Sequence, residues 1–421
     1  MTAPHLFLIV SVIGALFTLN ALRPPRHPEV LSMFFFFASW LTAELPYHHL
    51  AWQAIATVVF IAVGALHGWQ GWAGLGLTLA SWAGLLLLAA RSRASAQGFE
   101  DSMRKVLGHD YLTRVDAARS AGWGAPLQWR QLARPLPLRP AAGVTKLTDI
   151  AYAEPGDRAH RLDVYKPADG RTKCPTLLFI HGGAWIIGDK REQGIPMMNR
   201  LAAHGWVCMT ANYRLSPKAA FPAHLLDVKQ ALRWIREHGA EHGADPSFVV
   251  VSGGSAGGHL GALMALTAND PRYQPGFEDV DTSVQGAALF YGQYDFTNRL
   301  KLRSKGSIRF FERMIMKKKL ADDPAAFAAA SPIDQIGDHA PPMLIIHGSN
   351  DILIRVEEAR YFADLVAKAS RGPVVYAEVS GAQHAFDIFP SVRAMHVIAG
   401  VERYCDYIWS LEMQRRGART S

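Results

Sequence analysis

Two patterns of apolar residues divide this chain. Up to residue 90, apolar residues form four long runs, over residues 6–22, 30–45, 50–66 and 72–90. After residue 144, short apolar runs alternate with segments in which apolar residues recur every three or four positions. Long unbroken runs are typical of helices in a bilayer, and the later alternation is typical of buried strands and amphipathic helices. We therefore expect a transmembrane region over residues 1–91, a connector over 92–143 and an α/β domain over 144–415.

The first, third and fourth runs are long enough for a membrane span, which needs about 17 to 20 apolar residues. The second run is shortened by Glu44 and Pro46, so the pattern predicts three or four spans. A cleaved signal peptide would explain only the first run. A helical soluble domain is the alternative, but residues 33–38 read Met-Phe-Phe-Phe-Phe-Ala and offer no polar face to water.

The α/β domain is expected to contain a mainly parallel sheet with helices on both faces, because its strands are continuously apolar. The predicted strands cover residues 162–165, 176–180, 207–211, 248–251, 287–291, 343–346 and 374–379. The predicted helices cover residues 189–204, 222–239, 259–267 and 357–368. Residues 297–323 interrupt this alternation, which predicts a small cap inserted around 296–331.

The net charge of +8 belongs to the part of the chain after residue 90, because two Arg and two Glu cancel before it. No zinc-finger spacing or RNA-binding aromatic motif accompanies the charge, so it does not indicate a nucleic-acid partner. Attraction to anionic membrane lipid fits better beside apolar runs. Arg23 and Arg26 follow the first run, and Arg91 and Arg93 follow the fourth. By the positive-inside tendency, this multi-pass membrane protein would hold its α/β domain in the cytoplasm.

The three cysteines, Cys174, Cys208 and Cys405, are odd in number and widely scattered, which argues against a disulfide framework. Cys208 lies in an apolar run and is expected to be a buried, unreactive thiol.

The strongest chemical signal is a serine between a strand and a helix. Residues 253–257 read Gly-Gly-Ser-Ala-Gly, directly after the predicted strand 248–251 and before an apolar helix. This G-x-S-x-G pattern is typical of a nucleophile elbow, in which small neighbours let a tight turn expose the serine hydroxyl. The pattern predicts Ser255 as the nucleophile and the Ala256 amide as an oxyanion donor.

A second glycine-rich turn follows the strand 176–180, where residues 181–185 read His-Gly-Gly-Ala-Trp. Small side chains leave backbone N–H groups free to point at a substrate. We expect Gly182, Gly183 and Ala184 to form the rest of an oxyanion hole; an ordinary glycine turn is the alternative.

An acid and a base follow the serine, each just past a predicted strand. Asp351 follows the strand 343–346, and His384 follows the strand 374–379. The order Ser, acid, His is that of an α/β-hydrolase triad, in which His384 would take the proton of Ser255 and Asp351 would orient the imidazole. Asp295, Asp338 and Asp387 compete for the role of the acid, with Asp295 the main rival because it also follows a strand. His181, His259 and His347 are expected to be structural.

Together these motifs resemble the hormone-sensitive-lipase-like and feruloyl-esterase-like (BD-FAE-like) carboxylesterases of the α/β-hydrolase superfamily, over about residues 144–409. The resemblance is carried by residues 181–185, by Asn-Tyr-Arg-Leu-Ser-Pro at 212–217, by Gly-Ser-Ala-Gly-Gly at 254–258 and by Gly-Ser-Asn-Asp at 348–351. Two positions depart from the pattern: Gly254 stands where hormone-sensitive-lipase relatives have Asp, and Ala184 replaces the third glycine of the oxyanion loop. Membrane-tethered actinobacterial lipase and esterase homologues are especially similar. Residues 181–188 also resemble prenylcysteine methylesterases.

The expected function is therefore that of a membrane-tethered serine carboxylesterase or lipase, which needs no metal or cofactor. The predicted cap interleaves Lys and Arg with Phe310, Phe311, Met314 and Ile315, which suggests a lipophilic ester substrate reached at a membrane; a solvated cap face is the alternative. The other candidate functions are a prenylcysteine-methylesterase-like enzyme, a non-catalytic ligand-binding hydrolase fold and a membrane scaffold. An epoxide hydrolase or dehalogenase would need an Asp in place of Ser255.

Overall fold

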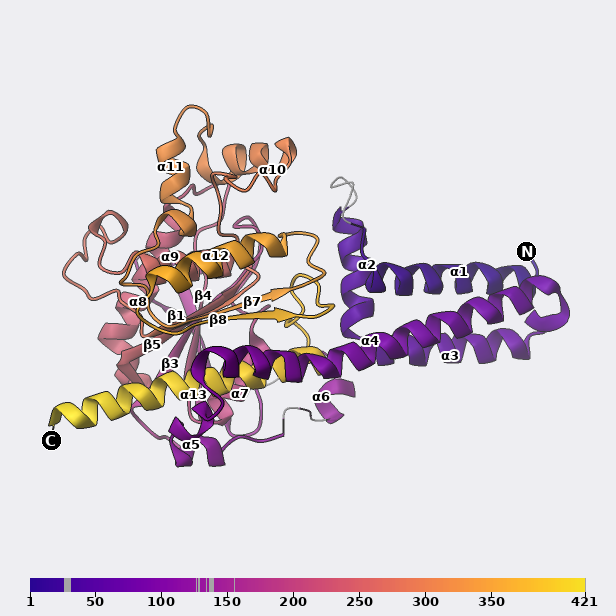
Figure 1. Cartoon of the computed structure of the whole chain (residues 1–421), viewed down its shortest axis with the longest axis horizontal. Coiled ribbons are helices and arrows are strands. Elements are labelled where there is room, and N and C mark those ends of the chain that lie inside the picture. The colour runs from indigo at the N-terminus through magenta and orange to yellow at the C-terminus, as the bar shows by residue number, and fades with distance from the viewer. Residues whose placement is uncertain are drawn as a thin grey trace.

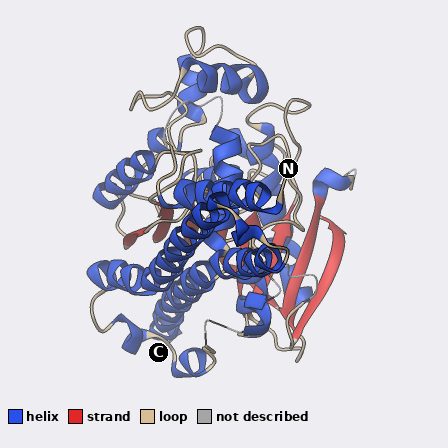
Figure 2. Cartoon of the chain, turned by 90° about the vertical axis from the view of Figure 1, so that its right-hand side faces the viewer, coloured by secondary structure: helices blue, strands red, loops and turns tan. Residues whose placement is uncertain are grey.

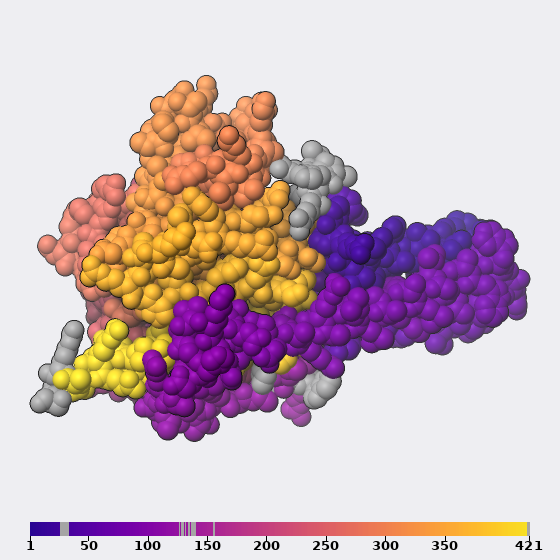
Figure 3. Space-filling model, in the orientation of Figure 1, coloured from indigo at the N-terminus to yellow at the C-terminus, as the bar shows by residue number. Residues whose placement is uncertain are grey.

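The computed structural model describes residues 1–25, 32–125, 127, 129–133, 135, 140–154 and 156–420. Figure 1 shows a bundle of helices projecting from an α/β domain, and Figure 3 shows the same division in space-filling form. The residues Arg26, Val30 and Leu31, on which part of the sequence analysis rests, lie outside the described set.

The N-terminal region is helical, as the apolar runs predict. It comprises α1 (Ala3–Leu22), α2 (Ser32–Glu44), α3 (Pro46–Ala62), the short 3-10 helix η2 (Ala65–His67) and α4 (Trp69–Leu107). Helices α1, α3 and α4 lie side by side, while α2 stands between them and the α/β domain (Figure 1). Among the described residues, two helices, α1 and α4, are long and apolar enough to cross a membrane. Helices α2 and α3, with 13 and 17 residues, are shorter, and the three or four membrane spans stay a prediction.

The bundle carries small and polar side chains inside and apolar side chains outside. Thr18 Oγ1 lies 2.8 Å from Ser81 Oγ, and Thr78 donates a hydrogen bond of 2.9 Å to Ser11, with all four side chains buried. The exposed apolar residues of α1 and α4 include Ile9, Val12, Ile13, Leu16, Leu19, Leu79, Leu86 and Leu87. A helix in water has the opposite arrangement, whereas small and polar contacts are how helices associate in lipid.

The boundary predicted between residues 91 and 92 falls inside α4, which is one continuous helix of 39 residues. Its second half carries Phe99, Met103 and Leu107 into the core of the α/β domain, which is why the helix continues past the apolar run. The rest of the predicted connector forms short pieces: η3 (Tyr111–Arg114), α5 (Ala117–Ala121) and α6 (Trp129–Ala133).

The described residues of the α/β domain form a sheet of eight strands in the order β1-β2-β4-β3-β5-β6-β7-β8. The strands are β1 (Val144–Ala151), β2 (Arg161–Pro167), β3 (Cys174–Ile180), β4 (Val207–Ala211), β5 (Ala244–Gly254), β6 (Gly286–Phe290), β7 (Met343–Gly348) and β8 (Val374–Val379). Strands β3 to β8 are parallel to one another, and β2 is antiparallel to β1 and β4. The prediction of a mainly parallel sheet is confirmed.

Helices cover both faces of this sheet (Figure 2). One core contains side chains of α8 (Ala223–His238), α9 (Ala256–Leu266) and α12 (Val356–Ala369), and the other contains side chains of α4, α7 (Ile195–Ala203) and α13 (Val392–Thr420). The helix predicted over 189–204 begins only at residue 195. Gly194 precedes it at φ 69°, where an added Cβ would lie 2.7 Å from the ring of Phe179.

The insertion predicted around 296–331 forms α10 (Lys305–Phe310), the π-helical turn η7 (Phe311–Met316) and α11 (Pro324–Ala329), which protrude beside the sheet (Figure 1). The remaining short 3-10 helices are η4 (Arg158–His160), η5 (Gly239–His242), η6 (Pro271–Tyr273) and η8 (Pro332–Asp334). The three cysteines are free and buried, and the expectation of a buried thiol at Cys208 is confirmed.

Candidate active site

Ser255 stands on a sharp turn between β5 and α9. Its backbone is at φ 58° and ψ −119°, a strained conformation for a residue with a side chain. The Ser255 N–H donates to the carbonyl of Phe290 at 3.0 Å, which fixes the turn to β6. A Cβ added at Gly253 or Gly257 would lie 2.6 or 2.0 Å from the carbonyl oxygen of Ile180, so both positions require glycine. This is the geometry that a nucleophile elbow needs.

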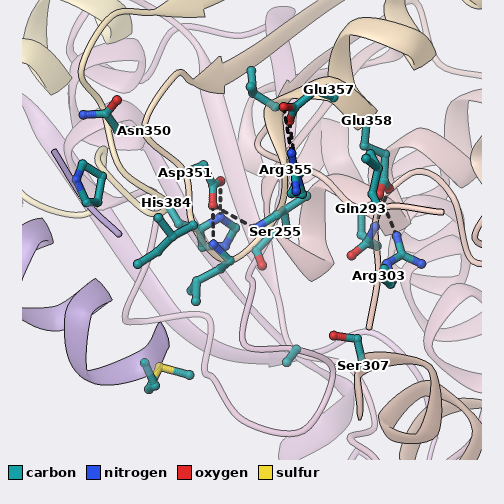
Figure 4. Close-up of a pocket in the computed structure, with 18 of the residues that line it drawn as sticks. Ser255, Gln293, Arg303, Ser307, Asn350, Asp351, Arg355, Glu357, Glu358 and His384 are labelled. Atoms are coloured by element: carbon teal, nitrogen blue, oxygen red, sulfur yellow. Dashed lines mark hydrogen bonds and ion pairs between the residues drawn. The ribbon is translucent and has the colours of Figure 1, made fainter. Parts of the chain in front are cut away.

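Asp351 and His384 come together at the same edge of the sheet. The Asp351 Oδ2 atom lies 2.7 Å from His384 Nδ1, and both side chains are buried. The other carboxylate oxygen accepts the amides of Leu353 and Ile354 at 2.9 and 2.8 Å. With Nδ1 facing Asp351, the Nε2 atom is left for a substrate or a nucleophile. Figure 4 shows Ser255 beside His384.

Asp351 has the electrostatic environment of a permanently charged carboxylate. Burial raises the pKa of its carboxyl, but the electrostatic attraction to His384 and the hydrogen bonds from His347 and His384 outweigh burial and hold the pKa well below its usual value. His347 Nε2 lies 3.2 Å from Asp351 Oδ2, the oxygen that faces His384, and 2.9 Å from the Ile354 carbonyl. His347 therefore contacts the carboxylate of Asp351 and helps to fix its position. The sequence analysis expected His347 to be structural but did not connect it with Asp351.

The rival acids are engaged elsewhere in the described structure. Asp295 accepts from the Thr297 hydroxyl at 2.8 Å and the Leu300 amide at 3.0 Å, so it holds the loop that enters the cap. Asp338 forms an ion pair with Arg371 at the surface. Of the four candidate acids, Asp351 is the one hydrogen-bonded to His384.

The glycine-rich turn lies against the elbow, because a Cβ at Gly182 would sit 3.1 Å from the Ser255 Cβ. The Gly182 amide donates to Gln193 Oε1 at 2.7 Å, so this predicted oxyanion donor already has a partner. The amides of Gly183, Ala184 and Ala256 are the other predicted donors. Ala184 has φ 51°, a conformation that glycine would adopt with less strain. Nothing in the local sequence pointed to Gln193.

The structure explains why position 254 is a glycine. A Cβ there would lie 2.8 Å from the hydroxyl oxygen of Tyr291, which donates a hydrogen bond to Asp387. The Tyr291 ring centroid also lies 4.5 Å from that of His384. Tyr291 therefore fills the space that a larger residue at 254 would need, and it packs on the base. Burial raises the pKa of the Asp387 carboxyl.

His181 and His259 are structural, as expected. His181 stacks on Tyr213 with centroids 4.5 Å apart, and His259 Nε2 bonds the Ala330 carbonyl at 2.7 Å. Burial lowers the pKa of His181 to about 4 and that of His259 to about 3, so both rings are neutral at pH 7. Among the described residues, no three His, Cys, Asp or Glu side chains gather as they would around a metal ion.

Ser255 and His384 open into a cavity of about 690 Å³, large enough for a small-molecule substrate. Trp185 and the cap residues Phe310 and Phe311 form apolar parts of its wall. The N-terminal region supplies Leu22, Arg23, Pro24 and Met33, which the sequence did not connect with the site.

A buried polar cluster borders the cavity on the cap side. Glu358 accepts from Arg303 at 2.7 Å (Figure 4). It also accepts from the Tyr294 and Asp295 amides at 2.5 and 2.7 Å. Arg303 also stacks on Phe311, with its guanidinium carbon 4.8 Å from the ring centroid. This cluster ties the cap to α12.

Comparison with known proteins shows the family of the chain. The BD-FAE family model matches residues 162–366. A probable carboxylic ester hydrolase of Mycobacterium tuberculosis, LipM, is 38% identical over 426 residues, which cover 98% of this chain and 97% of the relative. The chain belongs to this family of carboxylic ester hydrolases. The esterase LipQ of the same organism is 37% identical over 91% of this chain and 86% of its own length.

The protein is thus an α/β-hydrolase that hydrolyses carboxylic esters, and the resemblance inferred from its motifs is confirmed. A truncated carbohydrate esterase from gut microbiota shares the fold, with a TM-score of 0.56 and 23% identity over 63% of this esterase and 99% of that chain.

Proposed function

We propose that this esterase is a membrane-tethered serine carboxylesterase that acts on lipophilic esters through Ser255, Asp351 and His384. The observation that carries the proposal is the 2.7 Å hydrogen bond between Asp351 and His384, beside a strained Ser255 in one cavity. A non-catalytic hydrolase fold would have no need to hold three such groups in this arrangement.

The reaction follows from the positions of these groups. Ser255 Oγ bonds to the ester carbonyl carbon while His384 Nε2 takes the hydroxyl proton. The carbonyl oxygen becomes an oxyanion, which the amides of Gly183, Ala184 and Ala256 would hold. His384 then gives its proton to the alcohol as the ester C–O bond breaks. A water, deprotonated by His384, then bonds to the acyl carbon. The bond from that carbon to Ser255 Oγ breaks as His384 returns the proton to Oγ, which releases the acid.

The bundle supports attachment to a membrane. Its apolar side chains face outward, and the hydroxyls of Thr18 and Ser81 face each other inside. Because α2 packs on the α/β domain, we favour three spans, α1, α3 and α4. In that arrangement Arg23 and Arg91 share the end nearest the α/β domain, which the positive-inside tendency assigns to the cytoplasm.

A lipophilic substrate fits the cavity wall. Leu22 and Met33 of the N-terminal region and Phe310 of the cap line it, so the cavity opens where the candidate spans meet the catalytic domain. The apolar cap residues Phe311, Ile315 and Met316 are buried, while six of its cations are exposed: Lys305, Arg309, Arg313, Lys317, Lys318 and Lys319. An outward basic face would attract an anionic lipid surface.

The first test is Ser255→Ala in the full chain in detergent. Ester turnover and labelling by a fluorophosphonate probe are expected to disappear while the melting temperature stays unchanged. Ser283→Ala, which removes an exposed hydroxyl bonded to Asp281, is the matched control and should keep both. Turnover retained by Ser255→Ala would overturn the assignment of the nucleophile.

The second test concerns the substrate. The triple variant Lys305→Gln, Arg309→Gln, Arg313→Gln should lose activity on a long-chain ester in anionic vesicles and keep it on a short soluble ester. A control that removes three exposed cations elsewhere, Lys173→Gln, Lys368→Gln, Arg371→Gln, should keep activity on both esters. Equal losses on both esters would contradict a membrane role for the cap.

A further inference from the structure

Helix α2 contacts the loop that carries His384. The indole N–H of Trp40 donates to the carbonyl of Ala385 at 2.8 Å, and Ser39 Oγ accepts from the Gln383 side-chain amide at 2.9 Å. Ala385 and Gln383 are the two chain neighbours of His384. Two adjacent residues of α2 therefore hold the loop on both sides of the imidazole, across more than 340 positions of sequence.

The contact with Gln383 extends to the acid. Gln383 Oε1 accepts the amides of His384 at 3.1 Å and Ile352 at 3.2 Å, and Ile352 follows Asp351 directly. The side-chain nitrogen of Gln383 thus contacts α2, and its side-chain oxygen contacts the two loops that carry Asp351 and His384. A shift of Ser39 would be transmitted to the loops that set the distance between Asp351 and His384.

Aromatic packing completes the contact. The ring of Phe36 meets the His384 imidazole edge to face, with centroids 6.3 Å apart. Trp40 stacks on Phe36 at 5.5 Å and on Phe389 at 5.0 Å. Ser39 is fully buried and Phe36 is 5% exposed, so water does not compete for these contacts. Figure 1 shows α2 in this place between the bundle and the catalytic domain.

We propose that α2 positions the catalytic base, with Ser39 and Trp40 as positioning residues for His384. This inference rests on the proposed function, because it assumes that His384 serves Ser255. Precise placement of a general base is worth large factors in rate, and its supporting shell sets that placement. The apolar N-terminal region is then part of the catalytic apparatus as well as an anchor, since α2 lies between the candidate spans α1 and α3.

The test removes the two hydrogen bonds with little change in packing. Trp40→Phe keeps an aromatic ring between Phe36 and Phe389 but has no N–H, and Ser39→Ala removes one oxygen. The double variant of the full chain is expected to lower kcat for a soluble ester about tenfold and to leave KM within about twofold. The rate of fluorophosphonate labelling should fall in parallel, because it depends on the same activated serine.

Matched controls make the same chemical changes away from the His384 loop. Trp52→Phe removes an indole N–H that bonds His49 within α3, and Thr42→Ala removes a hydroxyl that bonds the Ala38 carbonyl within α2. Both should keep kcat, and all variants should keep the melting temperature of the parent to within a few degrees.

The outcomes separate the two proposals. A wild-type chain without ester turnover or labelling would refute the proposed function itself. An active wild type with an unchanged kcat in the double variant would refute only the positioning role. A raised KM with an unchanged kcat would also refute it, because α2 would then act as a substrate wall. Equal losses in the controls would show general destabilisation and overturn the inference as well.

Discussion

The carboxylate of Glu44, the last residue of α2, forms an ion pair with the guanidinium of Arg393 near the start of α13, and both side chains are fully buried. The two residues are 349 positions apart in sequence. The Ser391 hydroxyl donates to the second carboxylate oxygen at 2.7 Å. The predicted N-terminal region and the α/β domain are therefore joined by a charge pair that neither could bury alone.

Glu44→Gln is expected to destabilise the protein by about 3–5 kcal/mol, because it leaves the Arg393 charge buried without its counter-charge. Thermal unfolding in detergent measures this loss. Replacing both partners, Glu44→Leu with Arg393→Met, should recover most of it, since no buried charge remains. A single variant with the melting temperature of the wild type would show that the pair contributes nothing.

Asp351→Asn should reduce kcat by about 10⁴-fold with a preserved fold, because a neutral amide cannot stabilise the imidazolium of His384. Asp295→Asn is the matched change in the rival acid, and it should keep kcat to within a few fold. Steady-state kinetics on a soluble ester decide between them. The reverse ranking would move the acid of the triad to Asp295.

The sequence reveals those parts of the site that local patterns encode. Residues 177–180 are continuously apolar and buried in β3, and the glycines around Ser255 have no room for a side chain. Strand β1 was missed because Thr145, Lys146 and Asp149 make it polar, as an edge strand paired only with β2 can be. Contacts between residues apart in sequence, such as Gln193 with Gly182 or Trp40 with Ala385, leave no periodic pattern in the sequence. They can be recognised only once the fold is known.

Gly254→Ala should lower both stability, by roughly 1–3 kcal/mol, and activity, by at least about tenfold. The new methyl group would meet the Tyr291 hydroxyl at 2.8 Å, and Tyr291 packs on the His384 ring. Gly98→Ala is the matched control, because a Cβ at that position of α4 meets nothing within 4 Å. Full activity in Gly254→Ala would mean that the Tyr291 side chain moves aside freely.

His160 gives the stability of the α/β domain a dependence on pH. Its Nε2 lies 3.5 Å from the buried Asp227, and a hydrogen bond to this carboxylate raises the pKa of His160 against the opposing effect of burial. A pKa raised in the folded state favours folding while the group is protonated. The stabilisation is complete below the ordinary histidine pKa of about 6.5 and is lost as pH rises through the higher folded value.

His160→Gln should therefore lower the melting temperature most at pH 5.5 and least at pH 8.5. His238→Gln is the control, because His238 is an exposed histidine of α8, and its effect should be small at both values. A difference between wild type and His160→Gln that grows toward pH 8.5 would contradict the assigned direction of the shift.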